Sequence, residues 1–190
     1  MKVKITSFAG HRDVKLIEPP RFDDERGFFS ETYNKKELAQ SGLDATFVQD
    51  NQSLSRRRGT LRGLHFQRPP YAQGKLIRVV RGGILDVAVD IRHGSPTFGQ
   101  FVSAELSAEN WRQLFVPVGY AHGFITLEDA TEVLYKVTNY YSAEHEGGIC
   151  WNDPSLGIDW GIDTSGILLS DKDKSYSTLD EQPVCFEFED

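Results

Sequence analysis

The sequence predicts an all-β protein, a sandwich or barrel built from short strands. Runs that alternate apolar and polar residues recur along the chain, most clearly at residues 85–92. Turns containing Gly, Pro or Asn separate these runs, and amphipathic helical patterns are few. The 190 residues contain no internal repeat and no Gly- or Ser-rich linker, so we expect a single domain spanning residues 1–190.

The first thirty residues are expected to form a strand, a turn and a second strand. Pro19 and Pro20 should stop regular strand pairing because proline donates no backbone hydrogen bond. Residues 24–27 have the composition of a turn, and residues 29–33 are predicted to form a strand.

A short helix and a polar strand follow. Asn34 is a suitable N-cap for a helix over residues 35–41, which Gly42 would end. Residues 47–53 read as a strand that becomes polar, with amide, carboxylate and hydroxyl side chains suited to binding a sugar.

Residues 61–67 form the next predicted strand and carry an arginine and a histidine. Simple alternation places Leu61, Gly63, His65 and Gln67 on one face and Arg62, Leu64 and Phe66 on the other. From these residues alone, a satisfied core histidine and a surface arginine are as acceptable as a functional pair.

The clearest hairpin covers residues 75–92, with Gly82 and Gly83 supplying the tight turn. Its second strand alternates so that Val87 lies on a buried face and Asp86 on the opposite face. Further strands are expected at residues 99–106, 111–116, 124–127 and 131–140, whereas the last fifty residues lose clear alternation.

The composition excludes several functional classes. A net charge of −7 argues against general binding of nucleic acid or anionic membranes. No apolar run is long enough to span a bilayer, and the N-terminus lacks a secretory pattern, so a cytoplasmic location is expected. Cys150 and Cys185 are far apart in sequence and are predicted to be buried, reduced thiols rather than zinc ligands. Basic residues are concentrated between positions 56 and 81, which suits a small anionic ligand such as a phosphate ester, although a solvated face is the ordinary alternative.

Residues 117–124 contain the Pro-x-Gly-x-x-His pattern of the second cupin motif. Many cupins bind a metal through a His-x-His pair in the first motif, but this chain has His65-Phe66-Gln67, and glutamine is a poor metal ligand. His11, His93 and His145 have no metal-ligand spacing. We therefore expect a metal-free acid–base site rather than a metal-dependent oxygenase.

The chain resembles the dTDP-4-dehydrorhamnose 3,5-epimerase family of nucleotide-sugar epimerases. The matching blocks occur in order over nearly the whole chain, at residues 24–29, 47–51, 61–67, 73–76, 86–90, 95–99, 117–124, 135–141 and 169–173. The resemblance implies a cupin-type double-stranded β-helix, or jelly roll, with a few short helices. It also implies a dTDP-4-keto-6-deoxyhexose substrate, no cofactor, and a homodimer whose subunits exchange N-terminal strands.

The substrate implied by this resemblance has a ketone at C4, so the hydrogens on C3 and C5 are acidic and their removal gives an enolate. His65 is the predicted base, since imidazole is mostly neutral at cellular pH. The family pattern makes Asp173 its partner, with Asp171 as the competitor. Lys75 would stabilise the enolate oxygen, and Tyr135 would return a proton from the opposite face. Without the resemblance, Lys75 would be an ordinary strand-end lysine and Tyr135 a core aromatic residue.

The resemblance also implies a set of substrate-binding residues. Two arginines would hold the diphosphate, Arg26 and Arg62. The other family positions that contact the nucleotide or the sugar are Glu31, Gln49, Asp50, Asn51, His122, Glu146 and Lys172. Phe22, Phe28, Tyr140 and Tyr141 are all candidates to stack on thymine, and the N-terminal Arg26 and Glu31 are candidates for the neighbouring subunit's site.

The expected function is therefore epimerisation of dTDP-4-dehydro-6-deoxy-D-glucose at C3 and C5, which gives dTDP-4-dehydro-L-rhamnose. The main alternative is a related enzyme that inverts only one of the two centres. A metal-dependent cupin oxygenase and a non-catalytic nucleotide-sugar binding module are the alternatives from other classes.

Overall fold

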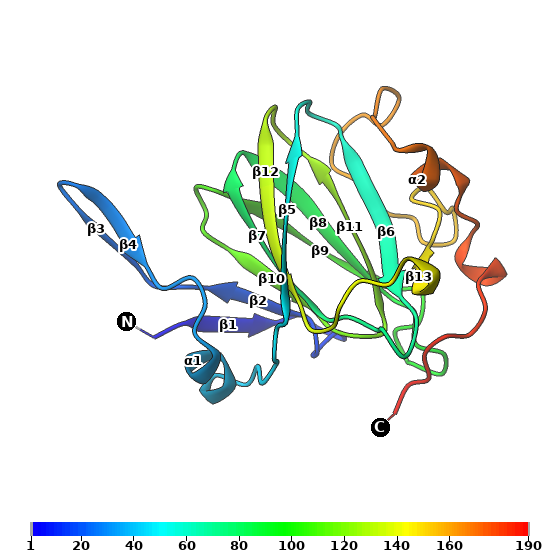
Figure 1. The fold of residues 1–190 in the computed structure, drawn as a ribbon. Helices are drawn as coiled ribbons and strands as arrows, with labels where there is room; N and C mark the ends of the chain where they lie inside the picture. Colours follow the sequence, from blue (N-terminus) through cyan, green and yellow to red (C-terminus); the bar gives the residue numbers. More distant parts are fainter. Residues whose placement is uncertain (1, 190) are drawn as a thin grey trace.

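A computed structural model describes residues 2–189 as two antiparallel β-sheets that face one another. The sheets form a jelly roll, as Figure 1 shows, and the all-β prediction is confirmed. Short helices lie at its periphery, and between residues 2 and 189 no helix has both the length and the apolar character needed to cross a membrane.

The strands of the two sheets come from distant parts of the chain. The first sheet has the order β1 (Lys4–Ser7), β2 (Lys15–Glu18), β10 (Gln113–Val116), β7 (Lys75–Arg81), β12 (Thr131–Val137) and β5 (Gln49–Ser55). The second has the order β13 (Glu146–Gly148), β6 (Leu61–Gln67), β11 (Tyr120–Thr126), β8 (Gly83–Asp90) and β9 (Phe101–Ser107). The helices are α1 (Lys35–Gln40), α2 (Asp171–Ser175) and two single 3₁₀ turns, Ala143–His145 and Leu179–Glu181.

A separate hairpin, β3 (Arg21–Asp24) and β4 (Gly27–Ser30), projects away from the two sheets (Figure 1). Its turn lies where residues 24–27 predicted it. The predicted strand over residues 29–33 is wrong beyond Ser30, because the following residues build the start of α1. The Asn34 amide donates to the Glu31 carboxylate, and the Asn34 side-chain oxygen accepts from the Glu37 N–H, as its predicted N-cap role requires.

The predicted alternation along β6 is wrong in its second half. Leu61, Leu64 and Phe66 share the apolar face, whereas Arg62 and His65 both line a cavity on the other face. The register with β11 shifts between His122 and Phe124, and Gly63 lies in this irregular stretch with a φ of +136°. The shift brings two residues that are three positions apart onto one face.

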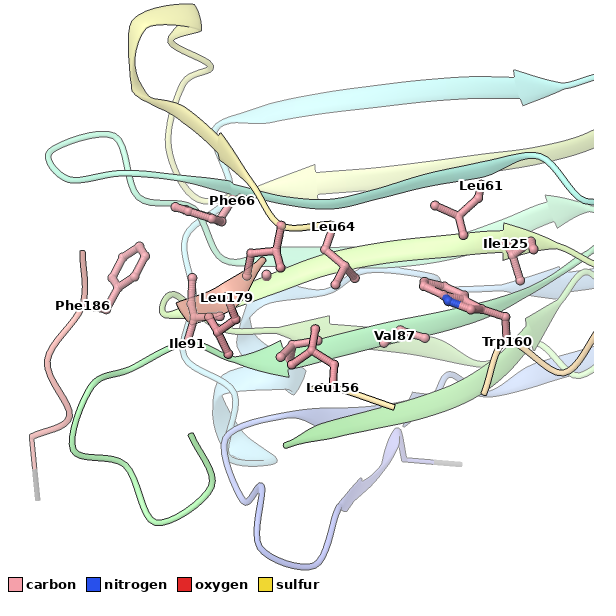
Figure 2. Close-up of a cluster of buried hydrophobic side chains, with 13 residues drawn as sticks. Leu61, Leu64, Phe66, Val87, Ile91, Ile125, Leu156, Trp160, Leu179 and Phe186 are labelled. Atoms are coloured by element: carbon pink, nitrogen blue, oxygen red, sulfur yellow. The ribbon is translucent and has the colours of Figure 1, made fainter. Parts of the chain in front are cut away.

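Strand β8 is buried on both faces, not on one face as predicted. Its inner face packs with the six-stranded sheet, where Ile84 and Ala88 meet Ile77 and Val133. The C-terminal segment covers its outer face, and Figure 2 shows the side chains that do so grouped over the sheet, among them Leu156, Trp160, Leu179 and Phe186. Because this segment contributes scattered apolar residues from loops, its covering role has no periodic signal in the sequence.

Several strand boundaries differ from the prediction by a few residues, and two of these differences lie near the site. Strand β11 begins at Tyr120 rather than at residue 124, directly after Gly119, which turns the chain with a φ of +87°. Strand β12 ends at Val137 rather than at residue 140. Cys150 and Cys185 are free thiols, as predicted, but both are partly exposed rather than buried.

Candidate active site

A cavity of about 490 Å³ lies between the two sheets. His65 enters it from β6 in the five-stranded sheet, whereas Lys75 on β7 and Tyr135 on β12 enter it from the six-stranded sheet. The imidazole and the phenol therefore belong to opposite walls of one cavity.

His65 forms a hydrogen-bonded pair with Asp173. The distance from His65 Nε2 to Asp173 Oδ1 is 2.5 Å, and Ser170 Oγ donates to Asp173 Oδ2 at 2.8 Å. Ser170 also caps α2, which holds Asp173 buried beside the imidazole. Its competitor Asp171 instead pairs with Lys174 at the surface.

Opposing influences act on this pair. Burial lowers the pKa of His65 and outweighs the raising effect of the Asp173 carboxylate, while Lys75 and Lys172 lower it further. Burial alone would raise the pKa of Asp173. The hydrogen bonds from His65 and Ser170 lower it by more, so the pKa of Asp173 is below its usual value. The imidazole is therefore neutral and the carboxylate ionised at neutral pH, which is the state that a general base requires.

The ring of Tyr176 packs edge-on against His65, with 5.8 Å between the centroids. It occupies the space above Gly148, where a Cβ atom would lie 2.3 Å from the ring. Tyr176 was not predicted as a site residue, and its position in a polar, aperiodic segment offers no signal for it.

Tyr135 is a half-buried phenol on the wall opposite His65. Burial raises its pKa, and the cations of Arg62 and Lys172 only partly oppose this effect. The phenol thus keeps its proton at neutral pH and can donate it.

Lys75 is a half-buried lysine that lines the same cavity as His65 and Tyr135. Its ammonium donates to the His65 backbone carbonyl at 3.4 Å. Burial lowers the pKa of Lys75 to about 8, although the carboxylates of Asp86 and Glu146 act to raise it. The side chain can therefore supply positive charge to an oxygen in the cavity up to about this pH.

A second histidine of the cavity, His122, also pairs with a carboxylate. Its Nε2 lies 2.6 Å from Oδ1 of Asp86, which is fully buried on the inner face of β8. Asp86 was not predicted as a site residue. The sequence did offer a signal for it. Asp86 lies between two apolar residues on the same face of a predicted strand, Ile84 and Ala88, and a carboxylate at such a position is rarely buried without a specific role.

Several predicted binding residues surround the opening of this cavity. Glu146 accepts hydrogen bonds from Lys172 Nζ at 2.6 Å and from the Tyr141 hydroxyl at 3.1 Å. Gln49 donates to Asn51 at 2.9 Å on the adjacent edge strand β5. Arg62 reaches Ser55 Oγ and the Leu54 carbonyl at the same edge.

Other predicted binding residues lie outside the cavity. Asp50 points to the opposite face of β5 and pairs with Lys136 at 2.8 Å. Arg26 lies at the exposed tip of the β3–β4 hairpin and pairs with Asp24, and Glu31 lies at the base of the hairpin. Within this chain, the structure does not bring these three residues to the His65 cavity.

The candidate metal donors of the alternative metal-dependent reading make other contacts. His65 and His122 each direct one ring nitrogen to a carboxylate, and Gln67 accepts a hydrogen bond from the Ser142 N–H. Among residues 2–189, no group of three His, Cys, Asp or Glu side chains has the arrangement of a metal site. A metal-free site remains a prediction, which metal analysis and an assay in chelator would test.

The arrangement can remove a proton next to a carbonyl and return one from the other side. A neutral imidazole and a protonated phenol line opposite walls, and a buried cation beside them can stabilise enolate charge. The fold is that of a cupin, and the site has the groups that an isomerase working by acid–base catalysis requires. The family model described as dTDP-4-dehydrorhamnose 3,5-epimerase matches residues 10–181, and the chain belongs to this family.

Curated relatives and solved structures agree with this family. The dTDP-4-dehydrorhamnose 3,5-epimerase of Sinorhizobium fredii is 54% identical over 176 residues, covering 93% of this chain and 90% of the relative. The Bacillus anthracis enzyme, solved with TDP and PPi bound, is 52% identical with a TM-score of 0.89, covering 93% and 99% of the two chains. The Legionella pneumophila enzyme, solved in complex with dTDP-4-keto-L-rhamnose, is 42% identical with a TM-score of 0.93, covering 99% and 100%.

Proposed function

We propose that this chain epimerises dTDP-4-dehydro-6-deoxy-D-glucose at C3 and C5 and produces dTDP-4-dehydro-L-rhamnose without a cofactor. The observation that carries the proposal is the placement of His65 and Tyr135 on opposite walls of one cavity, which Lys75 also lines. Inversion needs this two-sided arrangement, because a base that returned its proton to the same face would restore the starting configuration.

The reaction begins with abstraction of the proton on C3 or C5. Asp173 engages Nε2 of His65, so Nδ1 is the nitrogen that accepts the proton. The ionised Asp173 carboxylate then stabilises the imidazolium that forms. The electron pair of the broken C–H bond moves onto the C4 ketone oxygen, and Lys75 stabilises the resulting enolate.

Protonation from the opposite face completes each inversion. Tyr135 donates its phenolic proton to the carbon, and proton exchange with water restores both catalytic groups. The substrate carbonyl serves as the electron sink, so no redox or pyridoxal group is required. Inversion of the second centre repeats these steps after the sugar turns within the cavity.

The nucleotide binds, in this proposal, along the polar side chains that line the cavity. The Arg62 guanidinium suits a diphosphate oxygen, and the Glu146, Lys172 and His122 side chains provide polar contacts along the same cavity. Tyr141 lines the cavity and is the thymine-stacking candidate that this chain itself supplies.

A homodimer with exchanged N-terminal segments would complete the site. The β3–β4 hairpin projects from the body of the chain (Figure 1). Its side chains Phe22, Phe28 and Phe29 are exposed. Exposed aromatic residues of this kind suit a protein interface. Insertion of the hairpin into a neighbouring subunit would bring Arg26 and Glu31 to the neighbour's bound nucleotide.

Mixing two inactive variants tests the exchange. In a mixed dimer of Arg26→Ala and His65→Ala, the chain that retains His65 receives Arg26 from its partner, which restores one site. A statistical mixture should then recover about a quarter of the wild-type activity, since about half of the dimers are mixed and each has one complete site. If Arg26 served its own chain, the mixture would stay as inactive as its components.

Proton NMR of the product formed in deuterated water tests the reaction itself. The proposal expects deuterium and inverted configuration at both C3 and C5. Inversion at one carbon only would support a single-centre epimerase, like the 34% identical structural relative from Streptomyces bikiniensis, a 3'-monoepimerase. Binding without any exchange would reduce the chain to a nucleotide-sugar binding module.

A further inference from the structure

The carboxylate of Asp86 has one oxygen in use and one without a hydrogen-bond partner. The residue has no exposed surface, and Oδ1 accepts from His122 Nε2 at 2.6 Å. Among the described residues, Oδ2 has no hydrogen-bond partner. Burying a carboxylate oxygen without a hydrogen-bond partner costs free energy, and a positive charge nearby would reduce that cost.

Lys75 is a cation that lines the same cavity as His122, the hydrogen-bond partner of Asp86. The Asp86 carboxylate is the leading charge that raises the Lys75 pKa against the lowering effect of burial, ahead of Glu146 on β13. Besides Glu146, the other ionisable groups that share the cavity with Lys75 are His65, Arg62, His122, Tyr135, Tyr141, Lys172 and Asp173. Arg62 and Lys172 are cations that cannot help to keep the ammonium charged.

We propose that Asp86 is a positioning residue that keeps Lys75 charged beneath the substrate carbonyl and fixes the ring orientation of His122. This inference rests on the proposed function, since it assumes that Lys75 stabilises the enolate. The hydrogen bond between His122 Nε2 and Asp86 Oδ1 fixes the direction in which the imidazole ring is turned. One buried carboxylate thus sets the state of two cavity side chains that come from different sheets, on β7 and β11.

The test measures the ionisation of Lys75 without substrate. Cyanate carbamylates only the neutral amine, and peptide mass spectrometry reports modification at Lys75 as a function of pH. The wild-type curve should have its midpoint near the Lys75 pKa of about 8. In Asp86→Asn the midpoint should fall by about one pH unit, because the neighbouring negative charge is lost.

Two further variants make the result decisive. Asp153→Asn removes another buried carboxylate, which binds Ser155 and the Leu179 N–H in the C-terminal segment, and its Lys75 curve should match the wild type. Asp86→Ser replaces the carboxylate with a small polar group and should lower the midpoint as Asp86→Asn does. A midpoint that stays at the wild-type pH in a folded Asp86 variant would overturn the inference.

The pH dependence of turnover gives a second readout. Between pH 6.5 and pH 8.5, kcat/KM should fall about fourfold in the wild type and about 25-fold in Asp86→Asn, from the loss of the charged form of Lys75. If the wild type showed no epimerisation while the carbamylation curves shifted as expected, the proposed function alone would fail. Epimerisation with coincident carbamylation curves would overturn the Asp86 assignment alone.

Discussion

The Tyr135→Phe substitution should separate proton removal from inversion. It deletes one oxygen from a half-buried side chain on β12, whose ring remains to fill the same space. The His65–Asp173 pair lies on the other side of the cavity and is untouched by the change. The variant should therefore still remove the substrate proton, but it has no donor on the opposite face.

The expected loss follows from the state of the phenol. Burial raises the pKa of Tyr135, so the wild-type side chain is fully protonated and close to the cavity at neutral pH. Replacing a positioned acid with water typically costs about 10²–10⁴ in rate, or roughly 3–5 kcal/mol of transition-state stabilisation. Substrate binding should change far less, since a single hydroxyl contributes about 1 kcal/mol.

The assay follows deuterium and configuration separately by NMR in deuterated water. Tyr135→Phe should return deuterium to the original face, through His65, faster than it inverts either carbon. Tyr71→Phe is the matched control, because Tyr71 packs on His145 at the surface and should leave both rates unchanged. Inversion at the wild-type rate in Tyr135→Phe would refute the assignment of this residue as the acid.

Three further predictions concern the base, the cation and the fold. Asp173→Asn should lower kcat about 10²–10⁴-fold. It should also move the acid limb of kcat/KM to lower pH, because the Asp173 carboxylate raises the pKa of His65. An acid limb at the wild-type pH would contradict this pairing. The acid limb of the wild-type kcat/KM profile should lie below pH 6.5, because burial lowers the pKa of His65. At pH 9 the wild-type kcat/KM should be about tenfold below its maximum, because Lys75 must stay charged and loses its proton near its pKa of about 8. A profile that stays flat to pH 10 argues against this need for charge. Gly63→Ala should reduce the free energy of unfolding by about 2–4 kcal/mol in urea denaturation, because its Cβ would lie 2.5 Å from Gly123 Cα. Gly94→Ala is the control, since Gly94 also has a positive φ but has open space around its Cβ, and it should cost about 1 kcal/mol. Equal losses would dismiss the close contact as the cause.

The sequence alone was sufficient to predict the fold class and the family. Alternating runs and Gly–Pro–Asn turns predicted an all-β chain, and the capped helix after Asn34 lies where its local signals placed it. These features depend on residues close together in the chain, so they leave a local pattern. The ordered motifs from residue 24 to residue 173 predicted the family that the comparisons confirm.

The arrangement of the site was decided by tertiary structure. The register shift at Gly63 placed Arg62 and His65 on one face, which strict alternation had separated. The partnership of His122 with Asp86 depends on the pairing of β11 with β8. The two faces of β8 are buried because the other sheet covers one and an aperiodic C-terminal segment covers the other. Periodicity records only which way neighbouring side chains point, whereas these contacts join segments far apart in the chain, and packing alone determines which segments meet.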